Sequence, residues 1–250
     1  MASRILYFEC ESGISADMAL GALIGLGADA RVIAAEVAKV VRLPFDLRAE
    51  RIEKNGVRGI DVRVVVEEDA HGHNHEHGHP HGEGHAEHHA QRGHGEHMTY
   101  ARVRDMIAAA GLSERASRYA LDIFAVLGTG EAEVHGVALE EVAFHEVGSP
   151  ASLIDIIGTA VAADLIGIEE ICCGAVRDGQ GTIACAHGII PVPVPAVVAM
   201  SKRSEIPLEI DAGVTTEMVT PSGYAILNGL GAKFCPGIKL RTVREGFGFG

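Results

Sequence analysis

The chain has 250 residues and a mass of 26.3 kDa, which is enough for one large domain or two small ones with a real hydrophobic core. With 47% hydrophobic and 22% charged residues, the composition is that of a globular protein and excludes disorder over the whole length. The formal net charge of −13 argues against nucleic acid and anionic membrane surfaces as partners, because both favour a basic protein.

The cysteine count and the amino end favour a cytoplasmic protein. The five cysteines are an odd number without framework spacing, as is typical of a reduced compartment. Residues 1–4 run directly into a strand-like segment, with no signal peptide. No apolar run approaches the roughly 18–20 residues that a membrane span needs.

The first part of the chain combines strand-like and helical patterns. Residues 5–8 are apolar and predict a strand, and an apolar helix is expected over 16–26. Residues 45–53 and 57–67 predict a β-hairpin, because Asn55-Gly56 between them is a strong turn signal.

The remainder continues this alternation. A helix is expected to begin near Thr99, and Ser113 is expected to cap another that ends at about Leu127. Ser149-Pro150 and Thr220-Pro221 each predict a helix start, and residues 170–176 predict a buried strand. Since strands and helices alternate without a repeat, the sequence predicts an α/β (α+β) fold with a mixed sheet flanked by helices.

Eleven of the fourteen histidines lie in one segment, which otherwise consists largely of Gly, Glu and Ala. It cannot bury enough apolar surface to offset its ordering entropy, so we expect a disordered, flexible loop over 70–98. Neutral imidazole is the commonest ligand for borderline divalent metals, and the affinity order favours copper and nickel, with zinc close behind. The expected metal ligands are His71, His73, His75, His77, His79, His81, His85, His88, His89, His94 and His97. The alternatives are an expression tag or an idle polar linker.

A second candidate segment precedes the helix at Ser149. His145 and Glu146 lie directly before a helix start, where unpaired backbone N–H groups can face a ligand. Asp155 follows in the first turns of that helix, with Ser152 and Thr159 on the same face. A solvated helix face explains the same pattern, and both interpretations stay open.

Two further segments carry polar side chains at turns. Residues 10–18 connect a strand to a helix, where ligands gather in open α/β sheets, although Ser15 or Asp17 could simply cap that helix. Thr220 and Ser222 could present hydroxyl groups to an anion or serve as a plain cap.

His187 stands ahead of a segment with proline at every second position. That segment favours an extended edge strand. Cys185 lies two residues upstream, so a joint soft-metal site with His187 is geometrically allowed. A lone histidine is nevertheless more often a structural residue.

Taken in order, these segments resemble the LarC family, the nickel-insertion proteins of nickel-pincer cofactor biosynthesis. The matching segments are 12–15 with Asp17-Met18, 20–23, the histidine-rich loop, 144–148, 154–156, His187-Gly188 with its Pro-Val-Pro run, and 220–223. Their order and separation agree over essentially the whole chain.

The resemblance implies a metal-inserting lyase that places nickel in the pyridinium-3,5-bisthiocarboxylic acid mononucleotide, with Ni²⁺ and with CTP and Mg²⁺ or Mn²⁺ as cofactors. It implies that the histidine-rich loop gathers nickel, and it implies roles for two sets of residues. The catalytic set is His145, Glu146, Asp155, Asp17 and His187, and the substrate-binding set is Ser12, Ser15, Thr220 and Ser222.

Members of that family continue well beyond the length of this chain. We therefore expect residues 1–250 to be one LarC-like nickel-insertion domain, with the family's carboxyl-terminal domain absent. Three alternatives stay open: the first half of a split protein completed by a separate LarC-like chain, a truncated protein, and a short paralogue. The apolar, Gly-rich last third suggests a homo-oligomer. The alternative function is a non-catalytic nickel or zinc storage or delivery protein, which would need only the loop, whereas a catalyst would need His145, Asp155 and His187.

Overall fold

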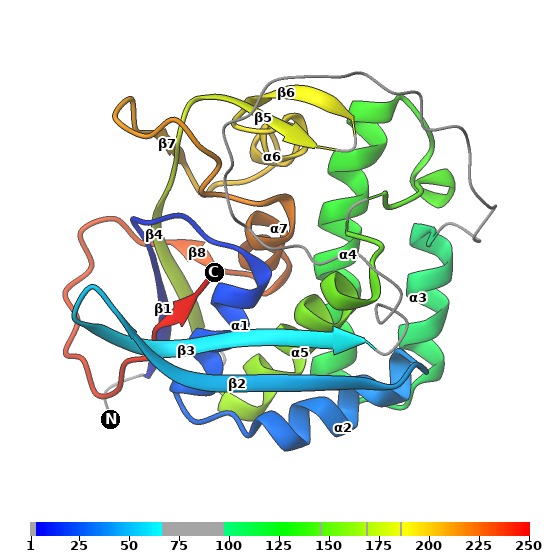
Figure 1. The fold of residues 1–250 in the computed structure, drawn as a ribbon, viewed down its shortest axis with the longest axis horizontal. Coiled ribbons are helices and arrows are strands. Elements are labelled where there is room, and N and C mark those ends of the chain that lie inside the picture. The colour runs from blue at the N-terminus through cyan, green and yellow to red at the C-terminus, as the bar shows by residue number, and fades with distance from the viewer. Residues whose placement is uncertain (1–3, 67–97, 146, 169, 186) are drawn as a thin grey trace, which may run out of the picture.

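The computed structural model describes residues 4–66, 98–145, 147–168, 170–185 and 187–250. The expected loop over 70–98 therefore lies outside the described residues, except for Met98. The elements in chain order are β1 (Ile5–Cys10), α1 (Ala16–Gly25), α2 (Ala30–Val40), β2 (Phe45–Lys54), β3 (Val57–Val66), α3 (Tyr100–Ala109), α4 (Glu114–His135), the 3₁₀ helix η2 (Leu139–Glu141), α5 (Pro150–Ile166), β4 (Glu170–Asp178), β5 (Gly181–Cys185), β6 (Gly188–Val192), α6 (Pro195–Ser201), β7 (Leu208–Ile210), α7 (Pro221–Gly229), β8 (Lys233–Phe234) and β9 (Gly248–Phe249). This mixture confirms the predicted α/β class (Figure 1).

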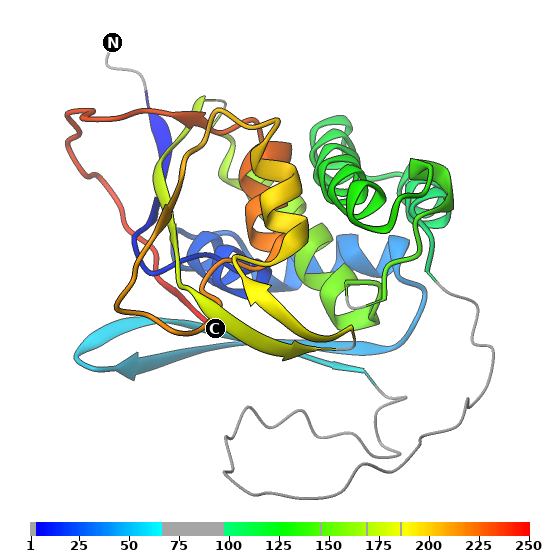
Figure 2. The same cartoon turned by 90° about the horizontal axis from the view of Figure 1, so that it is seen from above.

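A parallel sheet is built around β4. Strand β1 pairs along one edge of β4, while β8 and β7 pair one after the other along its opposite edge. Strand β4 is therefore the central strand, and its residues Ile171, Cys172 and Cys173 are nearly inaccessible to solvent. Figure 2 shows the helices gathered on one side of this sheet.

The predicted hairpin is confirmed. Strands β2 and β3 pair antiparallel from Phe45 opposite Val66 to Lys54 opposite Val57. Asn55 and Gly56 have φ angles of 52° and 79°, as a two-residue turn between strongly twisted strands requires. Figure 1 shows this hairpin across the lower part of the molecule, along α1 and α2, with β9 pairing parallel to β3.

Helix α5 forms the centre of the helical layer. It contacts α1, α2, α4 and α7, and ten of its residues are buried on all its faces, so it is apolar nearly all round. Small residues allow the helices to approach closely: a Cβ on Gly229 of α7 would lie 2.4 Å from the backbone of Ile123 on α4. Among the polar residues of α5, Thr159 is buried, and Asp155 belongs to the candidate site.

Strands β5 and β6 form a separate two-stranded sheet in which Thr182 faces Pro191. An edge position tolerates proline, as the sequence indicated. Helices α6 and α7 begin at Pro195 and Pro221, and the side chain of Thr220 accepts a hydrogen bond from the Gly223 N–H, which confirms the predicted cap. No helix in the described ranges is both long and apolar enough to cross a membrane.

The predicted end of the helix after Ser113 is wrong. Helix α4 does not stop at about Leu127 but continues to His135 and ends where Gly136 adopts a left-handed φ of 67°. Gly128 and Gly130 lie inside it because neighbouring side chains occupy the space that a Cβ would need, Leu139 at 2.8 Å and Met200 at 2.7 Å. The helix is therefore long enough to carry His135 to the site.

Candidate functional site

Three histidines from three separate segments meet at one exposed place. His135 ends α4, His145 lies in the segment before α5, and His187 lies in the turn between β5 and β6. One ligand atom from each ring falls within 4.8 Å of the others, and the ring centroids are 5.2–5.5 Å apart. We call these residues the histidine triad.

Each histidine is presented by a locally determined turn. The left-handed Gly136 ends α4 directly after His135, and Gly188, with φ of 91°, follows His187 at the start of β6. His145 follows Phe144, whose ring is buried against Phe124 at a centroid distance of 5.9 Å. The backbone positions of all three are thus defined by the fold before any metal arrives.

The triad has the chemistry of an open metal site. Three neutral imidazoles suit borderline divalent ions such as Ni²⁺, Cu²⁺ and Zn²⁺, and three protein ligands leave further coordination positions for water or substrate. Glu131, one turn earlier on α4, has its Oε2 atom 3.5 Å from Nε2 of His135. A carboxylate in that place can orient the imidazole or share the ion.

Two half-buried carboxyl groups form a second feature, which we call the carboxylate pair. Asp17 lies in the first turn of α1 and Asp155 in the second turn of α5. Burial, together with the negative charge of Asp17, raises the pKa of Asp155 to about 8. Asp155 Oδ1 is buried and has no hydrogen-bond partner in the described part of the chain. Asp155 is therefore largely neutral at pH 7.

Asp17 has a different environment. Its Oδ1 accepts hydrogen bonds from the Ser15 hydroxyl and, at 3.0 Å, from the Met18 N–H. Ser15 occupies the N-cap position of α1, yet its side chain makes no capping hydrogen bond, so the capping interpretation is wrong for Ser15. Two neighbouring carboxyls with environments this unlike are suited to different roles, one charged and one carrying a proton.

The start of α7 packs against the turn that holds Ser15. The Thr220 N–H donates to the Ile14 carbonyl at 3.1 Å, and a Cβ on Gly223 would lie 2.1 Å from that carbonyl oxygen. The hydroxyls of Thr220 and Ser222 are 3.0 Å apart. Thr220 also caps α7, which confirms the cap, while its contact with an anion stays a prediction.

The fold thus divides the residues that the sequence indicated. His145 and His187 belong to the triad, whereas Asp17, Asp155, Ser15, Thr220 and Ser222 lie around the strand-to-helix turn after β1. Ser12 is exposed and makes no hydrogen bond to another described residue. Cys185 does not belong to the group of three ligands that contains His187. Glu146 and the eleven loop histidines lie outside the described residues.

Sequence reasoning missed His135. A signal was present, because the three histidines that remain outside the histidine-rich segment are the three that meet. The predicted end of this helix, at about Leu127, lies eight residues before His135, so the sequence did not place His135 on the helix.

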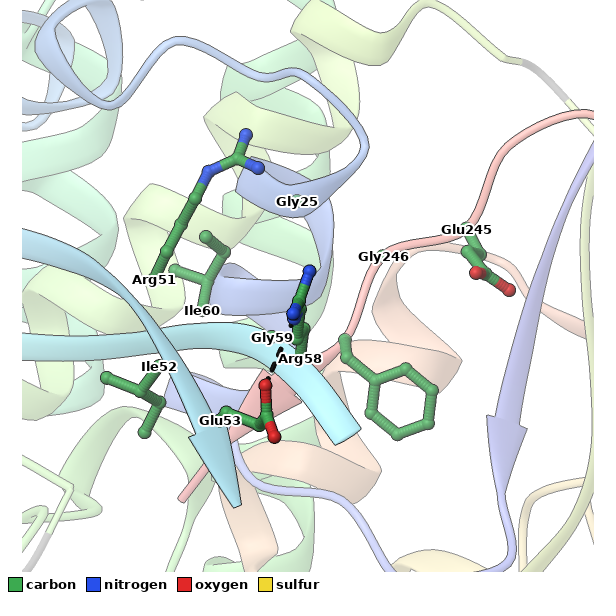
Figure 3. A pocket seen from close by; sticks show the side chains of 10 residues that line it. Gly25, Arg51, Ile52, Glu53, Arg58, Gly59, Ile60, Glu245 and Gly246 are labelled. Carbon is green, nitrogen blue, oxygen red and sulfur yellow. Dashed lines mark hydrogen bonds and ion pairs between the residues drawn. The ribbon is translucent and has the colours of Figure 1, made fainter. Parts of the chain in front are cut away.

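A cavity of about 470 Å³ lies elsewhere, between the β2–β3 hairpin and the last residues of the chain (Figure 3). Arg51, Arg58, Glu53 and Glu245 line it, and Arg58 is paired with Glu53 at 3.0 Å. Its charges balance and it contains none of the indicated residues, so its lining supplies no net charge.

Comparison with known proteins supports the metal chemistry. A family described as "Nickel insertion protein" matches residues 6–250. The pyridinium-3,5-bisthiocarboxylic acid mononucleotide nickel insertion protein of Acetivibrio thermocellus is 38% identical over 249 residues, which cover 99% of this chain and 56% of that protein. The protein of the same name from Akkermansia muciniphila is 36% identical over 248 residues, with the same two shares. No solved structure matches the chain.

The chain therefore spans little more than half the length of these curated relatives. The match over nearly all its residues confirms the resemblance drawn from its motifs, and the chain belongs to the family of nickel insertion proteins, the LarC family.

Proposed function

We propose that this chain inserts nickel into the pyridinium-3,5-bisthiocarboxylic acid mononucleotide and that the histidine triad holds the ion before transfer. The meeting of His135, His145 and His187 from three separate segments carries this proposal. Nickel is here a substrate, so its site must both bind the ion and release it. An exposed triad with open coordination positions meets both requirements.

The open coordination positions on the nickel ion allow the substrate to bind it directly. The two thiocarboxylates offer anionic sulfur atoms that can first take the open positions and then replace the histidines one at a time. Formation of the nickel–carbon bond releases a ring proton. His145 or Glu146 accepts that proton in this proposal, since either side chain is a base once it is not bound to the metal.

The carboxylate pair binds the mononucleotide in this proposal. The pyridinium ring is cationic, so the charged carboxylate of Asp17 attracts it, while the neutral Asp155 carboxyl can donate a hydrogen bond. Ser15, Thr220 and Ser222 add hydroxyl groups beside the same turn, and Ser12 lies at its exposed end.

Delivery of nickel to the triad is the proposed task of the histidine-rich segment. Its neighbour in the chain, Met98, accepts a hydrogen bond from the Phe144 N–H at 2.9 Å, and Thr99 forms an antiparallel bridge with Ala143. The segment therefore joins the fold one residue away from His145. A short path from many weak ligands to one defined set of three favours directed transfer.

The remaining parts of the proposal rest on the family. CTP with Mg²⁺ or Mn²⁺ activates or completes the reaction, a separate LarC-like chain supplies the carboxyl-terminal part, and the assembly is a homo-oligomer working in the cytoplasm. None of these has an assigned residue in this chain.

The test is nickel insertion itself. The purified chain is incubated with the nickel-free mononucleotide, nickel and Mg·CTP, with and without the carboxyl-terminal part of a relative, and the product is detected by mass. We expect product that is lost when His135, His145 or His187 is replaced by Ala. Val134→Ala, at an exposed neighbouring position, is the matched control.

Three outcomes separate the alternatives. Product only with the added carboxyl-terminal part identifies this chain as one part of the enzyme. No product under either condition, with nickel still bound by the triad variants, indicates the storage or delivery function. Product formation that survives all three replacements rules out the triad.

A further inference from the structure

Two cysteines far apart in the sequence touch beside the central strand. Cys172 lies on β4, and Cys235 directly follows β8, which pairs with β4. Their sulfur atoms are 2.7 Å apart. The backbone supports this contact, since the Cys235 N–H donates to the Cys173 carbonyl at 3.0 Å and so places Cys235 against the strand.

The two thiols differ in exposure. Cys172 is 1% exposed, whereas Cys235 is only partly buried. Burial raises the pKa of Cys172 to about 11, so its thiol stays protonated and reacts slowly by itself at neutral pH. An oxidant from solution therefore meets Cys235 first, with Cys172 waiting as the resolving thiol.

Cys173 is the other thiol on β4 that could compete. Successive side chains of a strand point to opposite faces, so Cys173 points away from the face that carries Cys172. Its sulfur instead lies 3.7 Å from the Lys233 carbonyl, and it is completely buried. The geometry thus selects one partner for Cys235.

We propose that Cys172 and Cys235 form a reversible disulfide within the chain when the protein meets hydrogen peroxide. The Cys235 thiol is first oxidised to a sulfenic acid, with peroxide reduced to one water. The Cys172 sulfur then attacks that sulfenic sulfur, the S–S bond forms, and the hydroxyl group leaves with the Cys172 proton as a second water. A dithiol reductant restores both thiols.

Such a bond would act on the last segment of the chain. Residues 236–250 follow Cys235 and return to the fold where Phe247 accepts a hydrogen bond from the Ile60 N–H at 2.8 Å. At Gly250 a Cβ would lie 3.2 Å from the Ser15 hydroxyl and 3.3 Å from Asp17. The disulfide would therefore bond Cys235, where this segment starts, covalently to β4, and Gly250 of the same segment lies beside the carboxylate pair. Formation of the disulfide itself requires no step of the nickel chemistry proposed above.

The experiment maps the bond directly. The reduced chain of residues 1–250 is treated with hydrogen peroxide at neutral pH, free thiols are blocked with N-ethylmaleimide, and a digest is examined by mass spectrometry without reductant. We expect one linked pair of peptides, one containing Cys172 and the other Cys235, which disappears on treatment with dithiothreitol.

Cys172 and Cys173 lie in one peptide, so the digest alone does not show which of them is bonded to Cys235. Matched variants identify the bonded cysteine. Cys172→Ala and Cys235→Ala should each abolish the link, whereas Cys173→Ala and Cys185→Ala should leave it intact. Circular dichroism of each reduced variant checks that it is folded. A link that survives in Cys172→Ala, a link between two copies of the chain, or oxidation of Cys235 only to sulfinic acid would each overturn the proposal.

Discussion

The histidine triad and the carboxylate pair flank the beginning of the same helix, yet the fold treats them in opposite ways. His145 precedes the Ser149 cap of α5 and contributes to an exposed cluster, whereas Asp155 follows the cap and is buried against α1. The triad is assembled by turns and the pair by packed helices. In the proposed function the triad releases an ion, which exposure favours, and Asp155 holds a proton, which burial favours.

The two regions also differ in what they do to stability. Exposed imidazoles keep their hydration and cost the fold little. A buried carboxyl loses hydration, and Asp155 keeps a proton instead of charge to limit that loss. We therefore expect a residue that lowers the stability of the fold but serves function only in the carboxylate pair, at Asp155. Four predictions test this difference, from the largest expected effect to the smallest.

The largest effect is expected at the triad. When the eleven histidines of the 71–97 segment are replaced by Asn, the remaining nickel affinity should belong to the triad. His145→Ala in that background should weaken nickel binding by more than about 100-fold, because loss of an outer partner alone costs up to about 100-fold. Isothermal titration calorimetry measures this, with Val134→Ala as control. Equal affinities would remove the triad as a nickel site.

Asp155→Asn should stabilise the protein while reducing insertion. The raised pKa means that the folded state holds a proton at pH values where the unfolded state has lost it, so this group's contribution to stability falls as pH rises from about 4 through about 8. Asn carries no such penalty. At pH 8.5 we expect a gain on the order of 5 kcal/mol in the free energy of unfolding, and at pH 4 almost none.

Urea denaturation at both pH values measures that gain. Equal stability of the variant and the parent at pH 8.5 would mean that Asp155 is not held neutral by its surroundings.

A smaller effect is expected at the carboxylate beside the triad. Glu131→Gln removes the charge next to His135 and should weaken nickel binding by about 10-fold, at the lower end for an outer partner. Glu133→Gln on the same helix is the matched control, because Glu133 pairs with Lys202 and Arg203 instead. A similar loss in both variants would indicate a general charge effect.

Ser15→Ala should have the smallest effect. It removes the hydroxyl that donates to Asp17. The cost is about 1 kcal/mol in the free energy of unfolding, because the hydrogen bond between Ser15 and Asp17 is partly exposed. The substrate KM should rise at the same time, because Asp17 loses its orientation. A change in stability without a change in KM would leave Ser15 with a purely structural role.

Much of the fold could be predicted because its signals are local. The Asn55-Gly56 turn, the caps at Thr99, Ser113 and Ser149, and the start of α7 depend on residues a few positions apart. The end of α4 could not be predicted, since Gly128 and Gly130 are breakers unless distant side chains fill the space beside them.

The candidate site divides in the same manner. The motifs around His145, Asp155 and Thr220 were visible because each stands at a helix start, where residue type and spacing have a direct meaning. His135 stands at a helix end with no motif around it. Its role appears only when α4 is given its full length and the β5–β6 turn is placed beside it.

The sequence by itself determined the α/β class, the turns and caps, and the family, since these depend on short patterns and their order along the chain. Only the tertiary structure decided that His135 joins His145 and His187, that Asp155 is neutral beside Asp17, and that Cys172 meets Cys235. The reason is physical: coordination, desolvation and thiol chemistry depend on distances through space, and these are set by packing between segments far apart in the chain.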